Sequence, residues 1–292
     1  MRLLVTGADG MLAHDVMRTA ELAGHEVLGT NRAELDIAEP GSIEEVLERV
    51  APEAVINCAA WTDVDGAETH PEKAHAINAA GAGNLARAAA DAGLRLVHVS
   101  TDYAFDGTAR VDAHGAPRAY VESDPTAPHT VYGQTKLAGE QLVLGASPRH
   151  TVARTSWLFG TAGSNFVATM LRLADERGEV RVVSDQTGSP TWAGHLAPAL
   201  IGLLEREVSG LVHLAGGGHV SWHDFAREIF RQAEVECRLG AGTSAEIDRP
   251  APRPAWSALE SERQDVLPLP PWQDGLAGYL AARVGLTRMG KS

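Results

Sequence analysis

The chain opens with RLLVTGADG, residues 2–10, a short apolar run that ends in a turn with two glycines. Arg2 to Thr6 is apolar and β-rich, and this predicts a buried strand. Met11 to Ala23 then predicts a helix that ends at Gly24. A strand, a glycine turn and a helix in this order are typical of the start of an α/β fold with a parallel sheet.

The turn itself offers a site for phosphate groups. Gly7 and Gly10 let a ligand approach the backbone, and the free N–H groups and dipole at a helix start favour an anion. The spacing departs from the G-x-G-x-x-G fingerprint, because Ala13 stands where a third glycine might. A dinucleotide cradle and a plain strand–helix turn are therefore both open at this point.

The first half of the chain alternates strands with helices. Buried strands are predicted at Glu26 to Gly29, Ala54 to Asn57, Leu94 to Val99 and Thr151 to Arg154. Helices are predicted at Ser42 to Val50, Pro71 to about Ala92 and from near Tyr132. Ser42 and Glu45 have capping-box spacing, so Ser42 is the expected N-cap. This alternation predicts a Rossmann-like, doubly wound parallel sheet.

The second half is less regular. It predicts helices at Asn165 to Arg177, His195 to Glu207 and Trp222 to Ala233, the last capped by Ser221, and strands at Val180 to Val183 and Leu211 to Leu214. A mostly irregular segment is predicted around Pro250, Pro252, Pro254, Pro268, Pro270 and Pro271. We expect a dinucleotide-binding domain over residues 1–160, rejoined by about 191–220. A smaller, partly interleaved α/β substrate lobe is expected over residues 161–292.

Composition limits the function classes. Of 292 residues, 44% are hydrophobic and 22% charged, as in a globular enzyme. The net charge of -13 argues against nucleic-acid binding, so an anionic ligand must meet a local cluster of donors. We expect no membrane span and no signal peptide. Cys58 and Cys237 suggest two reduced thiols in a cytoplasmic protein.

Cofactor preference is expected after the second strand. That strand ends in Gly29-Thr30-Asn31-Arg32, with no acid to bind a ribose diol, so Arg32 favours NADPH over NADH. A solvated loop arginine is the alternative. Asp36 and Ile37 are placed to hold the adenine. The third strand ends in the small residues of Asn57-Cys58-Ala59-Ala60, where a cofactor could cross the sheet edge.

Tyr132 and Lys136 are four residues apart, so they share one helix face. A nearby ammonium is expected to lower the pKa of the phenol, and Tyr132 could then pass a proton to a carbonyl oxygen. Thr101, where the fourth strand ends, could donate a second hydrogen bond to that oxygen. Such a pair also arises by chance in many helices. The order of all three groups on one sheet favours hydride transfer involving a carbonyl.

At these residues the chain resembles the extended short-chain dehydrogenase/reductase superfamily and, within it, the dTDP-4-dehydrorhamnose reductases. The resemblance is carried by VTGADGML (5–12), LDI (35–37), NCAAWTDVD (57–65), STDYAFDG (100–107), VYGQTKLAGE (131–140) and RTSWLFG (154–160). It continues in NF (165–166), DQTGSPT (185–191) and RP (253–254) before Ser257. Nearly the whole chain is covered.

The resemblance implies reduction of the C4 ketone of dTDP-4-dehydro-β-L-rhamnose with NADPH or NADH. The implied catalytic set is Thr101, Tyr132 and Lys136. Together with the residues above, the cofactor set is Gly7, Gly10, Met11, Leu12, Asn31, Arg32, Asp36, Ile37, Ala59, Ala60, Trp61, Thr62, Tyr132 and Lys136. The expected substrate contacts are Thr101, Asp102, Trp157, Asn165 and Arg253. Ordinary core packing is the alternative role for Trp157.

Other readings stay open. Some relatives bind a divalent ion such as Mg²⁺ through acids at a dimer contact; Asp15 matches one such position, but His195 replaces the other acid, and we name no metal ligand. A homodimer is likewise open. The alternative functions are a 4-ketoreductase for another dTDP-deoxysugar and a non-catalytic cofactor-binding regulatory subunit.

Overall fold

The computed structural model describes residues 1–289 and is built on a six-stranded parallel sheet. The strands lie in the order β12 (Gly210–His213), β7 (Thr151–Thr155), β4 (Arg95–Thr101), β3 (Ala54–Asn57), β1 (Arg2–Thr6) and β2 (Glu26–Thr30). Every neighbouring pair is parallel, which confirms the predicted fold class. The direction of winding reverses between β1 and β3, and ligands of open α/β sheets bind at the carboxyl ends of such strands.

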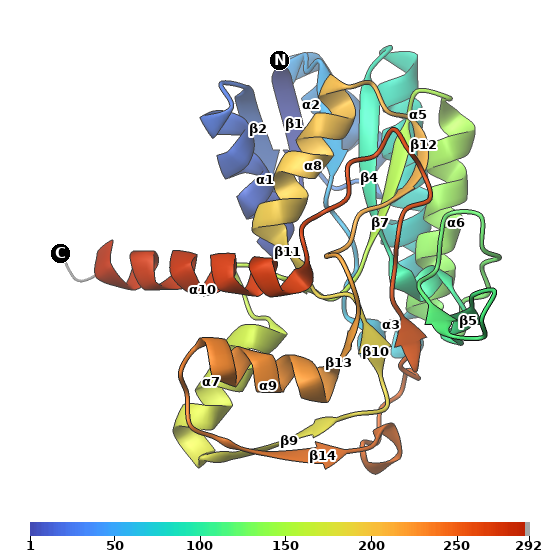
Figure 1. Ribbon diagram of the computed structural model, residues 1–292. Helices are drawn as coiled ribbons and strands as arrows, with labels where there is room; N and C mark the ends of the chain where they lie inside the picture. Colours follow the sequence, from blue (N-terminus) through green and yellow to red (C-terminus); the bar gives the residue numbers. More distant parts are fainter. Residues whose placement is uncertain (290–292) are drawn as a thin grey trace.

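Helices cover both faces of this sheet (Figure 1). One face packs against α1 (Met11–Leu22) and α8 (Ala193–Glu205). The other packs against α2 (Pro40–Val50), α5 (Ala82–Asp91) and α6 (Val131–Ala146). The helix predicted from Pro71 is present as α4 (Pro71–His75), a π-helical stretch (Ala76–Gly81) and α5, and α3 (Val64–Thr69) precedes it.

A smaller lobe lies beyond the carboxyl edge of the sheet (Figure 1). It contains α7 (Phe166–Arg177), α9 (Trp222–Gln232) and the parallel pair β9 (Glu179–Val183) and β14 (Arg238–Gly242). A second small sheet has the order β13 (Val220–Ser221), β10 (Thr187–Gly188), β15 (Trp256–Ser257). Between these elements the chain returns to the large sheet through α8 and β12. The functional division at residue 160 stays a prediction.

Two local expectations need correction. Helix α2 begins at Pro40 with Glu39 as its N-cap, so the expected Ser42 cap is wrong; Ser42 Oγ instead accepts a 3.1 Å hydrogen bond from the Asp36 N–H. The proline-rich segment gives way to a long helix, α10 (Trp272–Met289), which the sequence did not predict. The remaining elements are short: β5 (Arg110–Val111), β6 (Pro117–Arg118), β8 (Leu158–Phe159), β11 (Thr191–Trp192) and the 3₁₀ turns Asp102–Ala104 and Ser244–Glu246.

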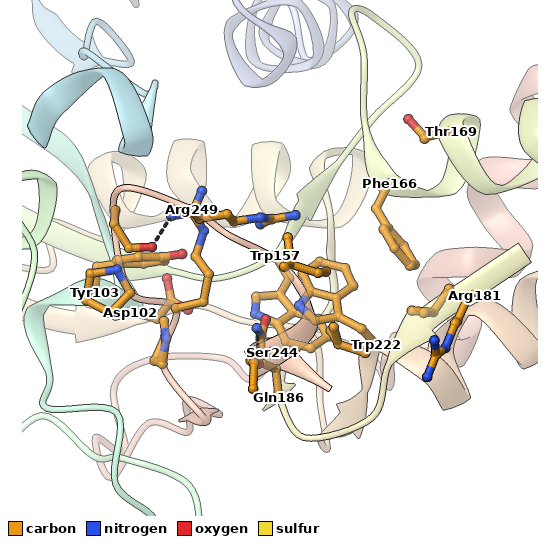
Figure 2. A pocket seen from close by; sticks show the side chains of 18 of the residues that line it. Asp102, Tyr103, Trp157, Phe166, Thr169, Arg181, Gln186, Trp222, Ser244 and Arg249 are labelled. Atoms are coloured by element: carbon orange, nitrogen blue, oxygen red, sulfur yellow. Dashed lines mark hydrogen bonds between the residues drawn. The ribbon is translucent and has the colours of Figure 1, made fainter. Parts of the chain in front are cut away.

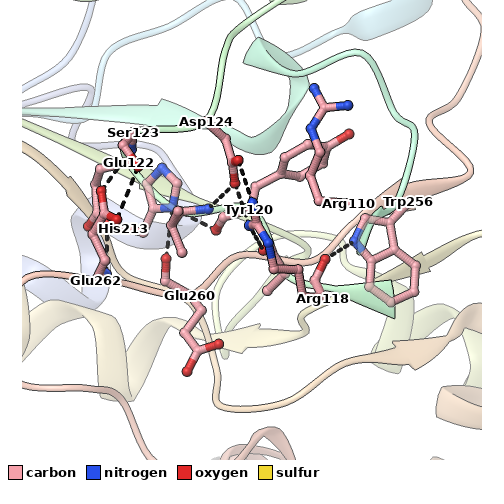
Figure 3. Close-up of polar contacts among 12 residues, drawn as sticks. Arg110, Arg118, Tyr120, Glu122, Ser123, Asp124, His213, Trp256, Glu260 and Glu262 are labelled. Carbon is pink, nitrogen blue, oxygen red and sulfur yellow. Dashed lines mark hydrogen bonds and ion pairs between the residues drawn. The ribbon is translucent and has the colours of Figure 1, made fainter. Parts of the chain in front are cut away.

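A polar network fastens the segment after β6 to the chain beyond β15 (Figure 3). Tyr120 exchanges backbone hydrogen bonds with Ala258 and Glu260, at 2.8 and 3.0 Å. Glu122 accepts hydrogen bonds from the His213 N–H at 2.7 Å and from the Ser261 hydroxyl at 2.6 Å. These contacts join the segment after β6 to β12 and to the chain after β15. No helix within residues 1–289 combines the length and apolar character that crossing a membrane requires.

Candidate active site

The glycine turn and the end of β3 meet at the winding reversal. Gly7 has a φ of +72°, and a Cβ there would lie 2.8 Å from the backbone nitrogen of Ala59, so only glycine fits. Gly10 is the N-cap of α1 and, within the described residues, no side chain caps that helix start. Backbone N–H groups are therefore presented at a close, narrow cradle, as a dinucleotide phosphate requires. Met11 and Leu12 follow in the first turn of α1.

The expected adenosine side lies at the end of β2. The Arg32 side chain is 73% exposed, and its Nε lies 3.2 Å from Asp36 Oδ2. Asn31 Oδ1 accepts hydrogen bonds from the N–H groups of Ala33 and Glu34, so this side chain shapes the turn. Ile37 is buried. Arg32 is thus an accessible cation held near the cradle by a carboxylate.

The chain after β3 is held in place by amide side chains. Asn57 Oδ1 accepts a 3.0 Å hydrogen bond from the Ala59 N–H, and Asn78 Oδ1 accepts one of 2.8 Å from the Trp61 N–H. Ala60 and Trp61 are half-buried and Thr62 is exposed. The fold therefore brings Ala59 to Thr62 to the same edge as the glycine turn.

The proposed catalytic groups come from β4 and α6. Thr101 is the last residue of β4, and its Oγ1 donates a 2.9 Å hydrogen bond to Asp102 Oδ1. The Thr101 oxygen accepts a 3.2 Å hydrogen bond from the Tyr103 N–H. The Tyr132 ring meets the edge of Tyr103 at a centroid distance of 5.4 Å. Thr101 was expected to donate to a ligand oxygen; in this structure its proton is directed to Asp102.

Burial dominates the electrostatics of these groups. It raises the pKa of Tyr132 to about 12, and the charge of Asp102 acts in the same direction. Burial also lowers the pKa of Lys136 to about 8. Lys136 Nζ lies 2.7 Å from the Val99 carbonyl and 3.1 Å from His98 Nε2, so the expected lowering of the Tyr132 pKa by Lys136 is not found. Tyr132 keeps its proton at neutral pH, as a proton donor must.

A cavity of about 760 Å³ opens beside Asp102 and is lined from both lobes (Figure 2). Its aromatic wall contains Trp157, which stacks on Trp222 at a centroid distance of 3.5 Å, and Phe166. Trp157 has a φ of +46°, a costly backbone conformation for a large residue. An aromatic face of this kind can pack on a sugar ring or a base.

Three arginines line this cavity in an otherwise acidic protein. Arg253 forms a two-point ion pair with Asp65, with distances of 2.9 and 2.7 Å, which lowers the pKa of Asp65. Arg181 pairs with Glu246. Arg249 has no ion pair within residues 1–289, so its charge is available to an anionic ligand. These arginines form the local cluster of donors that an anionic ligand would need in a chain with a net charge of -13.

The sequence reasoning missed much of the cavity wall. Arg181 lies on β9, Trp222 opens α9, and Arg249 lies in a loop, so no spacing along the chain links them. Asn165 was an expected substrate contact. It is buried as the N-cap of α7, with Oδ1 accepting from the Ala168 N–H and Nδ2 donating to the Gly160 carbonyl. A substrate contact for Asn165 stays a prediction.

The two residues considered for a metal lie near α8. Asp15 is buried, which raises its pKa, and its Oδ2 has no hydrogen-bond partner among the described residues. His195 packs against Trp192 at a centroid distance of 4.8 Å. Across residues 1–289, no three His, Cys, Asp or Glu side chains are grouped to hold a metal ion.

Comparison with known proteins shows the family to which the chain belongs. Residues 1–284 match the model of a family described as RmlD substrate binding domain. A dTDP-4-dehydrorhamnose reductase of Mycobacterium tuberculosis is 45% identical, covering 98% of this chain and 94% of the relative. A probable dTDP-4,6-dihydroxy-2-methyloxan-3-one 4-ketoreductase of Streptomyces antibioticus is 40% identical over 99% of both chains. The structure of a Bacillus anthracis dTDP-4-dehydrorhamnose reductase in complex with NADP is 34% identical, with a TM-score of 0.91 over 96% of this chain and 99% of the other.

Proposed function

Because this chain belongs to the RmlD substrate binding domain family, we propose that it reduces the C4 ketone of dTDP-4-dehydro-β-L-rhamnose to dTDP-L-rhamnose with NADPH. The observation that carries the proposal is that Thr101 donates to Asp102 at the wall of the cavity and that Tyr132 packs against Tyr103 of the same wall. The glycine cradle lies at the same edge of the sheet. A dinucleotide and a sugar can therefore meet at one phenol.

The residues present fit a nicotinamide dinucleotide. Gly7, Gly10 and the first turn of α1 would hold its phosphates, and Arg32 would contact a 2′-phosphate. When bound, the cofactor supplies the hydride. The chain supplies the proton: Tyr132 donates it to the ketone oxygen, and Thr101 orients the phenol. Lys136, four residues further along the same helix, would assist this proton transfer.

The cavity suits a sugar joined to a nucleoside diphosphate. Asp102 lies at its inner wall beside Thr101 and would hold a sugar hydroxyl, while Trp157 would pack on the ring. Arg249 and Arg253 would meet the diphosphate, whose charges the acidic surface would otherwise repel. Two Arg donors for the diphosphate and one aromatic face for the sugar ring suit such a ligand.

A second candidate is reduction of another dTDP-4-keto sugar. The similarity to the Streptomyces antibioticus ketoreductase favours it, because that protein is nearly as similar in sequence and acts on a different ring. A regulatory subunit is disfavoured, since a binder without turnover has no use for Thr101, Tyr132 and Lys136 together. A homodimer in the cytoplasm stays a prediction.

The test is NADPH oxidation, followed by absorbance, with the ketone generated in situ from dTDP-4-dehydro-6-deoxyglucose by a 3,5-epimerase. Oxidation that depends on the epimerase and yields dTDP-L-rhamnose supports the proposal. Oxidation without the epimerase indicates another 4-keto sugar as substrate. Cofactor binding with no oxidation by any such ketone would favour a regulatory role.

A further inference from the structure

A buried chain of polar side chains runs behind the site, from β1 to α6. It consists of Thr6, Asn57, His98 and Lys136, none of them more than 2% exposed. The distances are 2.7 Å from Thr6 Oγ1 to Asn57 Oδ1, 2.9 Å from Asn57 Nδ2 to His98 Nδ1 and 3.1 Å from His98 Nε2 to Lys136 Nζ. Buried polar groups of this kind must be matched donor to acceptor.

The orientation of Asn57 is fixed by a backbone group. The Ala59 N–H can only donate, and its 3.0 Å partner must therefore be the oxygen of the Asn57 side chain. The hydroxyl of Thr6 donates to the same oxygen. The Asn57 NH₂ group consequently faces His98. A flipped amide would set its NH₂ group against the Ala59 N–H.

The tautomer of His98 follows from this orientation. Its Nδ1 faces an NH₂ donor and must be an acceptor, so it carries no proton. Burial holds the pKa of His98 well below its usual range, which keeps the ring neutral. A neutral ring has one N–H, and this N–H must lie on Nε2. It therefore points at Lys136 Nζ.

An ammonium group cannot meet that N–H, because it has three donors and no acceptor. A neutral amine can accept the Nε2–H with its lone pair while it donates to the Val99 carbonyl at 2.7 Å. Any other assignment places two donors face to face, at Ala59, at Asn57 or at Lys136. The Ala59 N–H therefore fixes which atom donates and which accepts in every hydrogen bond between Thr6 and Lys136.

We propose that His98 is a positioning residue that holds Lys136 as a neutral amine against the sheet in the ligand-free protein. The role of Lys136 rests on the proposed function, whereas its protonation state does not. The arrangement keeps a positive charge off Tyr132, so the phenol retains the proton that the reduction consumes. His98 would act through Lys136 without touching substrate.

Other groups near Lys136 do not account for this state. Glu140, four residues further along α6, favours the ammonium form, but it is held in an ion pair with Arg154. Cys58, after β3, would also favour the ammonium as a thiolate. Burial raises the pKa of Cys58 to about 12, so it stays a neutral thiol. The charge of Glu140 therefore opposes deprotonation of Lys136, and the neutral Cys58 has no charge with which to affect it.

The sequence makes the direct measurement simple, because Lys73, Lys136 and Lys291 are its three lysines. Protein labelled with ¹³C at lysine Cε should give three titrating NMR signals, one of which disappears in Lys136→Met. Burial already lowers the pKa of Lys136 to about 8, and the Nε2–H of His98 should lower it further, so we expect that signal to be the signal of a neutral amine at pH 7. A Lys136 that is still an ammonium at pH 7 would overturn the proposal.

Substitution of His98 distinguishes the effect of its N–H donor on the Lys136 pKa from the effect of burial. In His98→Asn, the side chain can still accept from Asn57 but has no N–H that reaches Lys136. The Lys136 midpoint should rise by at least about one pH unit, a tenfold gain in proton affinity. An unchanged midpoint would show that burial alone is responsible. His150→Asn, at another buried histidine, should leave the Lys136 midpoint unchanged and controls for the smaller side chain.

A second readout needs no variant and no activity. Nitrogen-15 spectra of the histidine rings distinguish the two neutral tautomers, and the His98 signals are identified by their loss in His98→Asn or, if that variant does not fold, by triple-resonance assignment. A proton on Nε2 is the expected result. A proton on Nδ1, or a charged ring at pH 7, would overturn the proposal whatever the enzyme proves to reduce.

Discussion

Thr101 donates its hydroxyl proton to its own neighbour Asp102, across 2.9 Å. The Thr101 oxygen in turn accepts a 3.2 Å hydrogen bond from the N–H of Tyr103. The Tyr103 N–H, the Thr101 hydroxyl and the Asp102 carboxylate thus form one directed chain with the buried carboxylate at its end. That carboxylate is costly to ionise, and burial raises its pKa to about 6 despite the hydrogen bond from Thr101.

The raised pKa predicts that Asp102 destabilises the fold at high pH. The pKa of Asp102 is higher in the folded than in the unfolded protein, so protonated Asp102 stabilises the fold below about pH 4. This contribution to stability is lost as the pH rises through about 6. The loss is about 3 kcal/mol from the difference in pKa. Asp102→Asn should therefore be more stable than the wild type at pH 8, with the gain shrinking toward pH 5. Urea unfolding at both pH values measures it; a pH-independent difference would contradict the account.

Tyr132→Phe should bind NADPH normally but lose activity. The phenol is the proposed proton donor, and general acid catalysis contributes typically about 10²–10⁴-fold. The measurement is kcat alongside a fluorescence titration of NADPH. Tyr279→Phe, in the core of the small lobe beside Phe159, is the matched control and should keep full activity. A Tyr132→Phe enzyme with near-normal kcat would remove Tyr132 from the acid role.

Arg32→Ala should weaken NADPH binding more than NADH binding. Its guanidinium is exposed and is held 3.2 Å from Asp36, so it can reach a 2′-phosphate. We expect the ratio of the two dissociation constants to change by about tenfold, the value of one modest charged contact. Arg49→Ala, which breaks an exposed pair on α2, should not change the ratio. An equal loss for both cofactors would show that Arg32 does not read the phosphate.

Arg249→Ala should raise KM for the nucleotide sugar by about tenfold or more while leaving NADPH affinity unchanged. Arg249 lines the cavity without an ion pair in the described part of the chain, and a charge-assisted contact to a diphosphate contributes about 1.5–3 kcal/mol. Steady-state kinetics with each ligand varied measure this. Arg172→Ala removes a solvent-exposed pair with Glu176 and serves as the control. An unaltered KM would place the diphosphate elsewhere.

Glu140→Gln should destabilise the protein strongly. Glu140 and Arg154 form a two-point ion pair at 2.9 and 2.6 Å, and both side chains are 3% exposed. Loss of one partner leaves a buried, uncompensated charge and costs about 3–5 kcal/mol. Denaturant unfolding should show this loss, whereas Glu176→Gln, in an exposed pair, should change stability by less than about 0.5 kcal/mol. Equal effects would contradict the argument.

The parts predictable from sequence are those fixed by local pattern. The run from Arg2 to Gly10 indicated both the strand and the cradle, because a buried strand and a φ above zero leave strong signals. Helix α10 was missed because the prolines before it were taken to extend an irregular segment past Trp272. Arg249 and Trp222 were missed because they come from separate elements that line one cavity only in the folded chain.

His98 shows the same limit in the site itself. In sequence it is one polar residue inside an apolar strand. Its importance depends on Asn57 and Lys136, 41 and 38 residues away. The expected effect of Lys136 on the Tyr132 pKa was wrong for a related reason. Helical spacing places both side chains on one face, but it does not decide which partner the Lys136 amine contacts.

The central claim is hydride transfer to C4 of the sugar nucleotide. The direct measurement uses NADPH carrying deuterium at the transferable position of the nicotinamide ring, with dTDP-4-dehydro-β-L-rhamnose formed in situ, and locates the label in the product by NMR. We predict dTDP-L-rhamnose with one deuterium at C4. A product with no deuterium, or with deuterium at another carbon, would contradict the account.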